Sequence, residues 1–392
     1  STSATSEPSA IRRKLMRYGK PHEVVATDLM EAKLQRAVYS ERQLEDVLTD
    51  FWFNHFNVFL DKGADRYLVT SYERDAIRPH VLGKFRDLLA ATAQHPAMLF
   101  YLDNWQSADP NSGRGKRGLN ENYARELMEL HTLGVDGGYT QKDVTEVARC
   151  FTGWTILQPF RVGEFRFQKN IHDKGEKTVL GVRIPAGGGQ EDGEKVLDIL
   201  AHHPSTARFL SRQLAQRFVA DNPPESLINR MAATFRKKDG DLREVMNTML
   251  SSPEFWSQGA WRAKVKSPLE MVLSAVRASG ADMESAFVLT QKIAELGQPL
   301  YRKVEPTGYP NTSEDWVNSA SLLGRMNLAL ALAGNKLPGI KAGNVPEGDA
   351  EALAKALLFT TPSDETRKAI LAKTNTTPVT GLVLGSPDFQ RR

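Results

Sequence analysis

The sequence predicts a mainly α-helical protein, a multi-helix orthogonal array with one small antiparallel β insertion around residues 156–184. Apolar residues recur at helical spacing through most of the chain, as in residues 21–39 and 205–219. Proline and glycine separate these segments at positions typical of helix starts and ends. Only residues 155–184 alternate between apolar and polar side chains, which is the pattern of half-buried strands.

Changes in composition divide the predicted fold into segments. Residues 1–20 begin with a Ser/Thr/Pro-rich stretch that indicates a flexible N-terminal segment, and residues 21–335 are expected to form the helical domain that carries the β insertion. Residues 336–348 are rich in proline and glycine and predict a linker. Residues 349–392 are expected to form a helical tail that packs on the main domain.

The composition excludes several kinds of site and partner. The 392 residues include 51 Lys or Arg and 47 Asp or Glu, so the net charge of +4 does not predict binding to nucleic acid. No apolar run approaches the length that a membrane span needs. The single cysteine, Cys150, excludes an intrachain disulfide and any multi-cysteine metal site. Residues 113–118 match a dinucleotide-binding glycine spacing, but no strand precedes them, so we expect no cofactor.

The charged stretch GLNENYARELMELHTLG, residues 118–134, predicts one helix that a side-chain cap at Asn120 opens and Gly134 ends. At about 100° per residue, one face of this helix is polar. That face carries Glu121, Asn122, Arg125, Glu126 and Glu129. Glu121 and Glu129 each lie four residues from Arg125, whereas Glu126 has no cation on its own helix. The pattern predicts either a functional site around Glu126 or a solvated, salt-bridged face.

Carboxylate chemistry fits this helix best. Hydrolysis of a glycosidic bond needs one protonated and one ionised carboxyl group. We expect Glu126 to be the acid, and Glu121, which lies beside Arg125, to be the base or nucleophile. Asparagine amides can bind sugar hydroxyls and tryptophan rings can stack on sugars, which makes substrate-binding candidates of Trp52, Asn54, Asn104, Asn122 and Trp154.

Two other functions stay open. The same carboxylates can simply hold neighbouring basic residues in place, in a non-catalytic envelope protein that binds a glycan or another protein. A metal-dependent enzyme is the third possibility, with no metal site assigned. Because the chain has no H-E-x-x-H motif, the ligands would come from several segments, such as His55 and His172 with a glutamate. For His55, the structural alternative is a core histidine with satisfied hydrogen bonds.

Several segments resemble the bacterial domain-of-unknown-function family 1800. The longest is GLNENYARELMELHTLGVDGGYTQKDVTEVARCFTGWT, and FWFNHFNV, HDKGEKTVLG, GGGQEDGEKVLDIL and HHPSTARFL join it. With KSPLE, PTGYPN and GSPDF, the resemblance extends from about Ser40 to the last residue. It implies an exported bacterial protein, periplasmic or extracellular, and it implies no particular reaction.

The resemblance also adds residues and partners. The motif segments place five more residues in the expected substrate site, namely His55, Arg125, His172, Asp173 and Lys177. Family members usually carry a further helical segment and a signal before the part seen here, whereas this chain begins at Ser1. We therefore expect either a cleaved segment or a short family member. The expected partners are a polysaccharide, a separate N-terminal segment or a partner exported protein.

Overall fold

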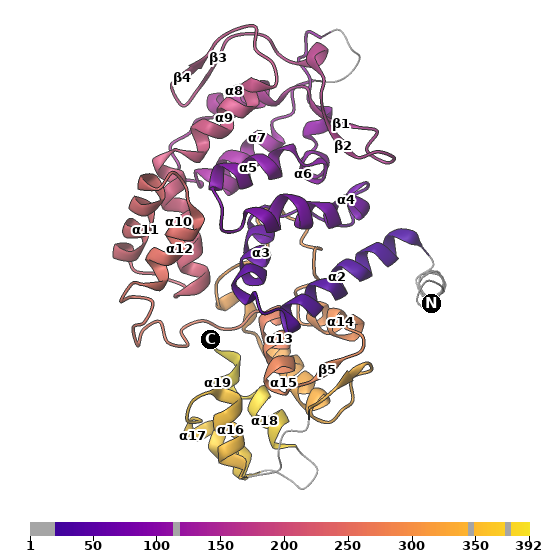
Figure 1. The fold of residues 1–392 in the computed structure, drawn as a ribbon, viewed down its shortest axis with the longest axis vertical. Coiled ribbons are helices and arrows are strands. Elements are labelled where there is room, and N and C mark those ends of the chain that lie inside the picture. The colour runs from indigo at the N-terminus through magenta and orange to yellow at the C-terminus, as the bar shows by residue number, and fades with distance from the viewer. Residues whose placement is uncertain (1–19, 113–117, 344–348, 373–377) are drawn as a thin grey trace, which may run out of the picture.

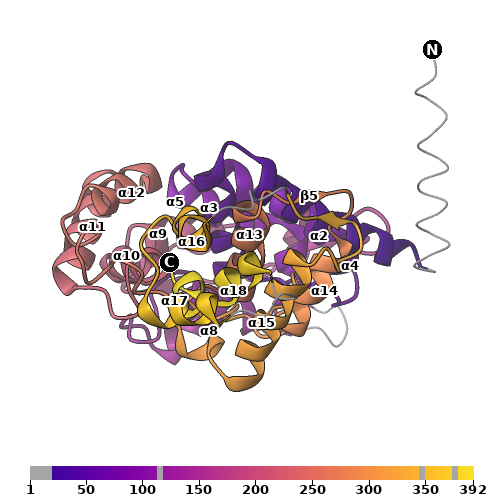
Figure 2. The same cartoon turned by 90° about the horizontal axis from the view of Figure 1, so that it is seen from below.

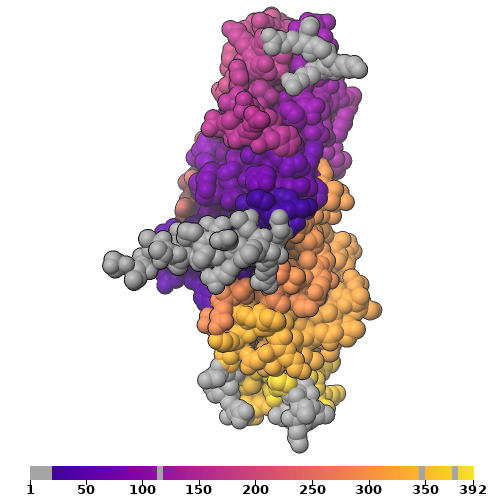
Figure 3. All heavy atoms as spheres, turned by 90° about the vertical axis from the view of Figure 1, so that its right-hand side faces the viewer, coloured from indigo at the N-terminus to yellow at the C-terminus, as the bar shows by residue number. Residues whose placement is uncertain are grey.

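The computed structural model describes residues 20–112, 118–343, 349–372 and 378–392. Within these ranges the chain is mainly helical with small antiparallel hairpins, so the predicted fold class is confirmed. The predicted flexible segment, apart from Lys20, and most of the glycine-rich loop lie outside the described residues. The molecule is elongated, with the earlier part of the chain at one end and the last third at the other (Figure 1, Figure 3).

The body, residues 43–250, holds the predicted charged helix and two hairpins. Its helical segments are α3 (Gln43–His55), α4 (Asp65–Ser71), η1 (Tyr72–Ile77), η2 (Arg78–His80), α5 (Phe85–Gln94), α6 (Pro96–Tyr101), η3 (Asn104–Gln106), α7 (Asn122–Glu126), η4 (Leu127–Thr132), α8 (Gln141–Phe151), η5 (Lys169–Ile171), α9 (Glu191–Ala201), α10 (Pro204–Phe218), α11 (Glu225–Lys237) and α12 (Leu242–Leu250). Proline occupies the first turn of α6 and α10, where the ring nitrogens of His95 and His203 accept the capping hydrogen bonds.

The C-terminal lobe, residues 268–392, packs below the body in Figure 1. Its helical segments are α13 (Pro268–Ala278), α14 (Phe287–Glu295), η6 (Glu314–Trp316), α15 (Ser319–Ala333), α16 (Ala350–Leu358), α17 (Asp364–Leu371), α18 (Val379–Gly385) and α19 (Pro387–Gln390). The first described helix, α2 (Pro21–Tyr39), contacts α3 and α4 of the body and α13 and α14 of the lobe. Figure 2 shows α18 beside α15, against which it packs. One continuous set of buried apolar residues runs from α2 to α19.

The predicted β insertion is present as two separate hairpins. β1 (Trp154–Leu157) pairs with β2 (Glu164–Phe167) in antiparallel register, with Trp154 opposite Phe167. β3 (Lys177–Val179) pairs with β4 (Val182–Ile184), with Lys177 opposite Ile184. A third pair, which the sequence does not predict, joins β5 (Asp282–Met283) to β6 (Ile340–Lys341). The predicted linker therefore contains a strand, β6, that pairs with β5. Residues 344–348 of that linker lie outside the described ranges.

The charged helix begins later than its sequence predicts and changes its winding. It starts as the α-helix α7 and continues directly as the π-helix η4. The Asn120 side chain does accept a hydrogen bond, from the Asn122 amide at 2.9 Å. Gly134 ends the segment with φ +81°, as predicted, and a Cβ atom there would lie 2.9 Å from the Phe209 ring on α10. Glycine is therefore required both for the turn and for the approach of α10.

Candidate functional site

Glu121 and Glu126 belong to the same helix but have different neighbours. The two oxygens of Glu121 accept hydrogen bonds from Thr145 Oγ1 at 2.7 Å and Gln141 Nε2 at 2.8 Å. Glu126 is half-buried, and among the described residues no cation lies within ion-pair distance of it. Burial, followed by the charge of Glu129, raises the pKa of the Glu126 carboxyl group, against an opposing effect of Arg125. Glu126 therefore has a raised pKa and no ion pair within the described residues, while Glu121 is hydrogen-bonded to α8.

Three of the expected substrate-binding residues lie in the core of the body. The rings of Trp52 and Trp154 are fully buried. Asn104 is also buried, and its Nδ2 donates to the carbonyl oxygens of Phe151 at 3.2 Å and Trp154 at 3.1 Å. In these positions the three side chains support the fold, because a polymer outside the protein does not reach them.

His55 and Asn54 end α3 among aromatic side chains. His55 Nε2 lies 3.0 Å from the carbonyl oxygen of His131, which requires the nitrogen to carry a proton and donate it. Burial lowers the pKa of His55 to about 4, more than this hydrogen bond raises it. Asn54 exchanges two hydrogen bonds with the backbone of Tyr309. Both residues therefore fit the structural alternative, a polar group satisfied inside the fold.

Two expected site residues remain on the outer surface of the charged helix. Asn122 is exposed, and its Nδ2 lies 3.4 Å from the carbonyl oxygen of Leu102. Arg125 donates to Gln141 Oε1 at 2.9 Å and lies 3.5 Å from Glu121. Together with Glu126 they keep a polar face on this helix.

The structure brings His172, Asp173 and Lys177 together at the base of the β3–β4 hairpin. Lys177 is fully buried, and its Nζ donates to Asp192 Oδ2 at 2.7 Å and to the carbonyl oxygen of Asp173 at 2.5 Å. His172 Nε2 lies 3.2 Å from the same Asp192 oxygen. Asp173 forms a two-point ion pair with Arg149 of α8. The cluster ties the hairpin to α8 and α9, and all of its charged groups are occupied.

These positions do not form a metal centre. No group of three or more His, Cys, Asp or Glu side chains within the described ranges is arranged to hold a metal ion. His55 and His172 lie in different clusters, one against His131 and one against Asp192. The metal-dependent alternative therefore has no site in the described part of the chain.

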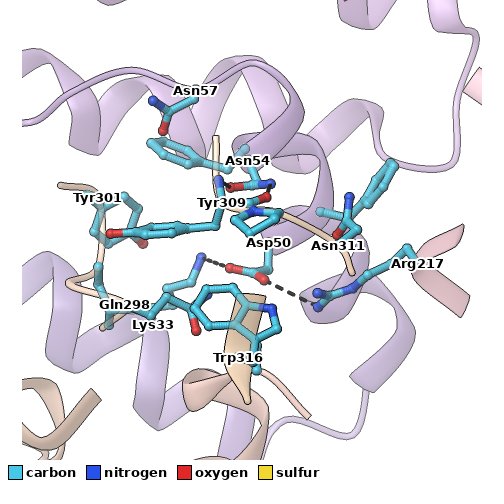
Figure 4. A pocket seen from close by; sticks show the side chains of 15 residues that line it. Lys33, Asp50, Asn54, Asn57, Arg217, Gln298, Tyr301, Tyr309, Asn311 and Trp316 are labelled. Carbon is cyan, nitrogen blue, oxygen red and sulfur yellow. Dashed lines mark hydrogen bonds and ion pairs between the residues drawn. The ribbon is translucent and has the colours of Figure 1, made fainter. Parts of the chain in front are cut away.

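A charged chamber that the sequence does not predict lies between α2, α3 and the PTGYPN segment, residues 306–311 (Figure 4). It encloses about 40 Å³. Asp50 lies at its centre, 3.0 Å from Lys33 Nζ and 3.5 Å from Arg217 Nη2. Lys33 also pairs with the buried Glu73 at 3.3 Å. Among the expected site residues only Asn54 lines this chamber, where it holds the PTGYPN segment.

A much larger cleft between the body and the C-terminal lobe adjoins the chamber. The cleft holds about 890 Å³ and shares Lys33, Asp50 and Arg217 with the chamber. Its rim includes large exposed aromatic side chains, with Trp256 76%, Trp261 66% and Phe359 87% exposed. Exposed aromatic surface around a cavity of this size is typical of a binding site.

The cleft lining is strongly basic. It carries eight basic and four acidic side chains, a net charge of +4, which equals the net charge of the whole chain. The basic residues are Lys33, Arg78, Arg217, Arg262, Lys266, Arg277, Arg391 and Arg392, and the acidic residues are Asp46, Asp50, Glu270 and Asp388.

The acidic residues of the cleft floor are already paired. Glu270 lies 3.1 Å from Arg217 and 3.0 Å from Arg392. Burial by itself would raise the pKa of Glu270, but these two arginines outweigh it and hold the pKa at about 2. Asp50 is shared between Lys33 and Arg217. Each of these two carboxylates is therefore shared between two basic side chains.

The fold and this cleft define a mainly helical protein with a cavity between two lobes whose lining is basic. None of the described helices is long and apolar enough to cross a membrane. Residues 3–391 match a protein family of unknown function, DUF1800, so the chain belongs to that family. No curated protein and no solved structure gives a significant match.

Proposed function

We propose that this protein binds an acidic polysaccharide in the cleft between its body and its C-terminal lobe, without cleaving it. The observation that carries the proposal is the net charge of +4 on the cleft lining. A surface of one sign attracts a polymer of the opposite sign and concentrates it near the site. The exposed rings of Trp256 and Trp261 supply flat apolar surface on which sugar rings can stack.

The pairing of the acidic residues favours binding over hydrolysis at this place. A glycosidase needs two carboxyl groups that are free to exchange protons or attack the sugar. In the cleft floor, Asp50 and Glu270 each bridge two basic side chains. Carboxylates held in this way position the arginines and are not available as an acid and a base.

Titration calorimetry with polygalacturonate, compared with neutral dextran, tests the proposal. We expect binding of polygalacturonate alone, weakening as salt is added because the attraction is screened. Trp256→Ala should weaken binding about tenfold, which corresponds to about 1.4 kcal/mol. Phe160→Ala is the matched control, because Phe160 is an exposed aromatic residue (71%) of the β1–β2 hairpin, away from the cleft. Equal binding of dextran, or binding of polyglutamate in place of polygalacturonate, would overturn the proposal.

Hydrolysis of a polysaccharide at the charged helix is the second candidate function. Burial and Glu129 raise the pKa of Glu126, which supports a role for Glu126 as the acid, with Glu121 as its partner. Release of reducing sugar ends from polygalacturonate by the unaltered protein, lost in Glu126→Gln, would support this function. Activity retained in Glu126→Gln would remove Glu126 from that role.

We also propose that the protein works in the periplasm or outside the cell. The resemblance of the motif segments to exported bacterial proteins supports this location, as does a cleft suited to a polymer of the envelope. Fractionation of bacterial cells that express the full-length gene tests it. Recovery of the protein in the cytoplasmic fraction alone would contradict it.

A further inference from the structure

Lys266 lines the cleft in a setting unlike that of its neighbour Lys264. The Lys264 amine forms an ion pair with Asp221. The Lys266 amine lies 3.7 Å above the ring centre of Phe389, and no carboxylate of the described residues lies within ion-pair distance of it. The side chain is half-buried and faces a cavity of about 890 Å³. It is an amine held at a binding surface without an anion.

The groups around Lys266 disfavour its protonated form. Three guanidinium groups act on it, from Arg262 of the preceding loop, Arg392 of the last described segment and Arg325 of α15, while Glu270 of α13 opposes them. Burial first, and then these arginines, lower the pKa of Lys266 to about 8. Contact with the Phe389 ring acts in the opposite direction, because a ring face attracts a cation. A substantial fraction of the amine is therefore neutral near physiological pH, and the neutral amine is the nucleophilic form.

We propose that Lys266 is a reactive amine that condenses with the carbonyl group of an anionic aldehyde or 2-oxo acid bound in the cleft. Nζ attacks the carbonyl carbon and forms a carbinolamine, which loses water to give the imine; no oxidant or reductant takes part. Arg262 and Arg392, which line the same cleft, supply positive charge for the anionic group of such a compound. This chemistry goes beyond the proposed polymer binding and does not depend on it, because it uses one small carbonyl compound and one side chain.

Reductive trapping tests the proposal on the unaltered protein. The protein is incubated with glyoxylate and sodium cyanoborohydride, and the lysines that become carboxymethylated are located by mass spectrometry. At about pH 7 we expect Lys266 to react about tenfold faster than the exposed lysines Lys195 and Lys237. The lowered pKa of Lys266 increases its neutral fraction by more than it reduces the nucleophilicity of the amine. The rate at Lys266 should rise with pH and level off above about 8.

Two comparisons separate a reactive site from simple exposure. Glycolaldehyde, a neutral aldehyde of similar size, should label Lys266 more slowly relative to Lys195 than glyoxylate does. Arg262→Gln removes one neighbouring cation, so it should slow labelling of Lys266 and leave Lys195 unchanged. Labelling that follows exposure alone, or the same rate at Lys266 and Lys195, would overturn the proposal. If the unaltered protein does not bind polygalacturonate but Lys266 is still labelled faster than Lys195, only the proposed function is contradicted.

Discussion

The side chain of Asn54 and the backbone of Tyr309 exchange two hydrogen bonds. Asn54 Nδ2 donates to the Tyr309 carbonyl oxygen at 2.8 Å, and the Tyr309 amide donates to Asn54 Oδ1 at 2.7 Å. The amide side chain thereby pairs with the PTGYPN segment as a neighbouring strand would. Gly308 lies so close that a Cβ atom there would be 2.3 Å from the Asn54 carbonyl oxygen. Two motif segments that are distant in the sequence are joined at this point.

Asn54→Ala should lower the free energy of unfolding by about 2 kcal/mol, because it leaves an amide and a carbonyl group of Tyr309 without partners. Urea denaturation followed by circular dichroism measures this change. Asn247→Ala is the control, since Asn247 is exposed on α12, and its effect should stay within about 0.5 kcal/mol. Equal effects of the two substitutions would mean that the hydrogen bonds between Asn54 and Tyr309 do not stabilise the fold.

Asp65 should make stability fall as the pH rises. It is fully buried, and neither carboxylate oxygen has a hydrogen-bond partner among the described residues. Burial raises its pKa well above the ordinary value of 3.8. The folded state therefore holds a proton that the unfolded chain releases. The stability that protonated Asp65 contributes is fully present below about pH 4. It is lost as the pH rises towards the pKa of Asp65 in the folded state, at about 1.4 kcal/mol per pH unit.

The substitution Asp65→Asn tests this sign. Urea denaturation between about pH 4 and 8 should show the variant gaining stability relative to the unaltered protein at each higher pH. Asp136→Asn, which removes an exposed carboxyl group, is the control. A constant difference between Asp65→Asn and the unaltered protein across this range would show that Asp65 is ionised in the folded state.

The periodicity of the sequence was sufficient to predict the fold class because long amphipathic helices carry their pattern locally. α8, for example, has a capping box from Thr140 to Asp143 and buries Val144, Val147 and Phe151 on one face. The two-residue strands β5 and β6 have no period to detect, and their pairing depends on contacts between distant segments. The π winding of η4 is likewise a tertiary outcome, since its residues fit an ordinary helical wheel.

The periodicity of the sequence does not predict the cleft. Lys33 and Asp50 lie on amphipathic helices where a charged residue normally faces solvent, and only the packing of α2 on α3 buries them together. Arg217 and Glu270 come from helices that are about fifty residues apart in the sequence. The KSPLE motif contains two residues of the cleft lining, Lys266 and Glu270, but in the sequence it indicates only the start of a helix.

Gly193→Ala should destabilise the protein, although alanine favours helices. Gly193 lies in the first turn of α9, and a Cβ atom there would be 2.7 Å from the buried indole ring of Trp154. The expected loss is about 1–3 kcal/mol from overpacking, offset in part by about 1 kcal/mol of helix propensity. Thermal unfolding should show a lower Tm, and Trp154→Phe in the same chain should restore part of it. Gly118→Ala, where the added Cβ meets no atom of the described residues within 4 Å, is the control. An unchanged Tm for Gly193→Ala would mean that Trp154 can shift freely.

The buried pair of Lys177 and Asp192 should show a strong energetic coupling. Removing the carboxylate by Asp192→Ala leaves the fully buried Lys177 ammonium without its counter-charge, so we expect a loss of about 3–5 kcal/mol in the free energy of unfolding. The double variant Lys177→Met with Asp192→Ala should lose less stability than the single variants Lys177→Met and Asp192→Ala predict together, because no lone charge remains. Urea denaturation of the four proteins gives the coupling energy.

The same hairpin supplies a matched control for that cycle. Arg183 and Glu176 form an ion pair at 2.5 Å, but both side chains are exposed, at 72% and 49%. Solvent screens such a pair, so its coupling energy should be far smaller than that of Lys177 and Asp192. If both cycles gave the same small value, the Lys177–Asp192 pair would be solvated and the hairpin would be held by its apolar contacts alone. A large coupling only at Lys177 would show that the buried charges fix the hairpin on α9.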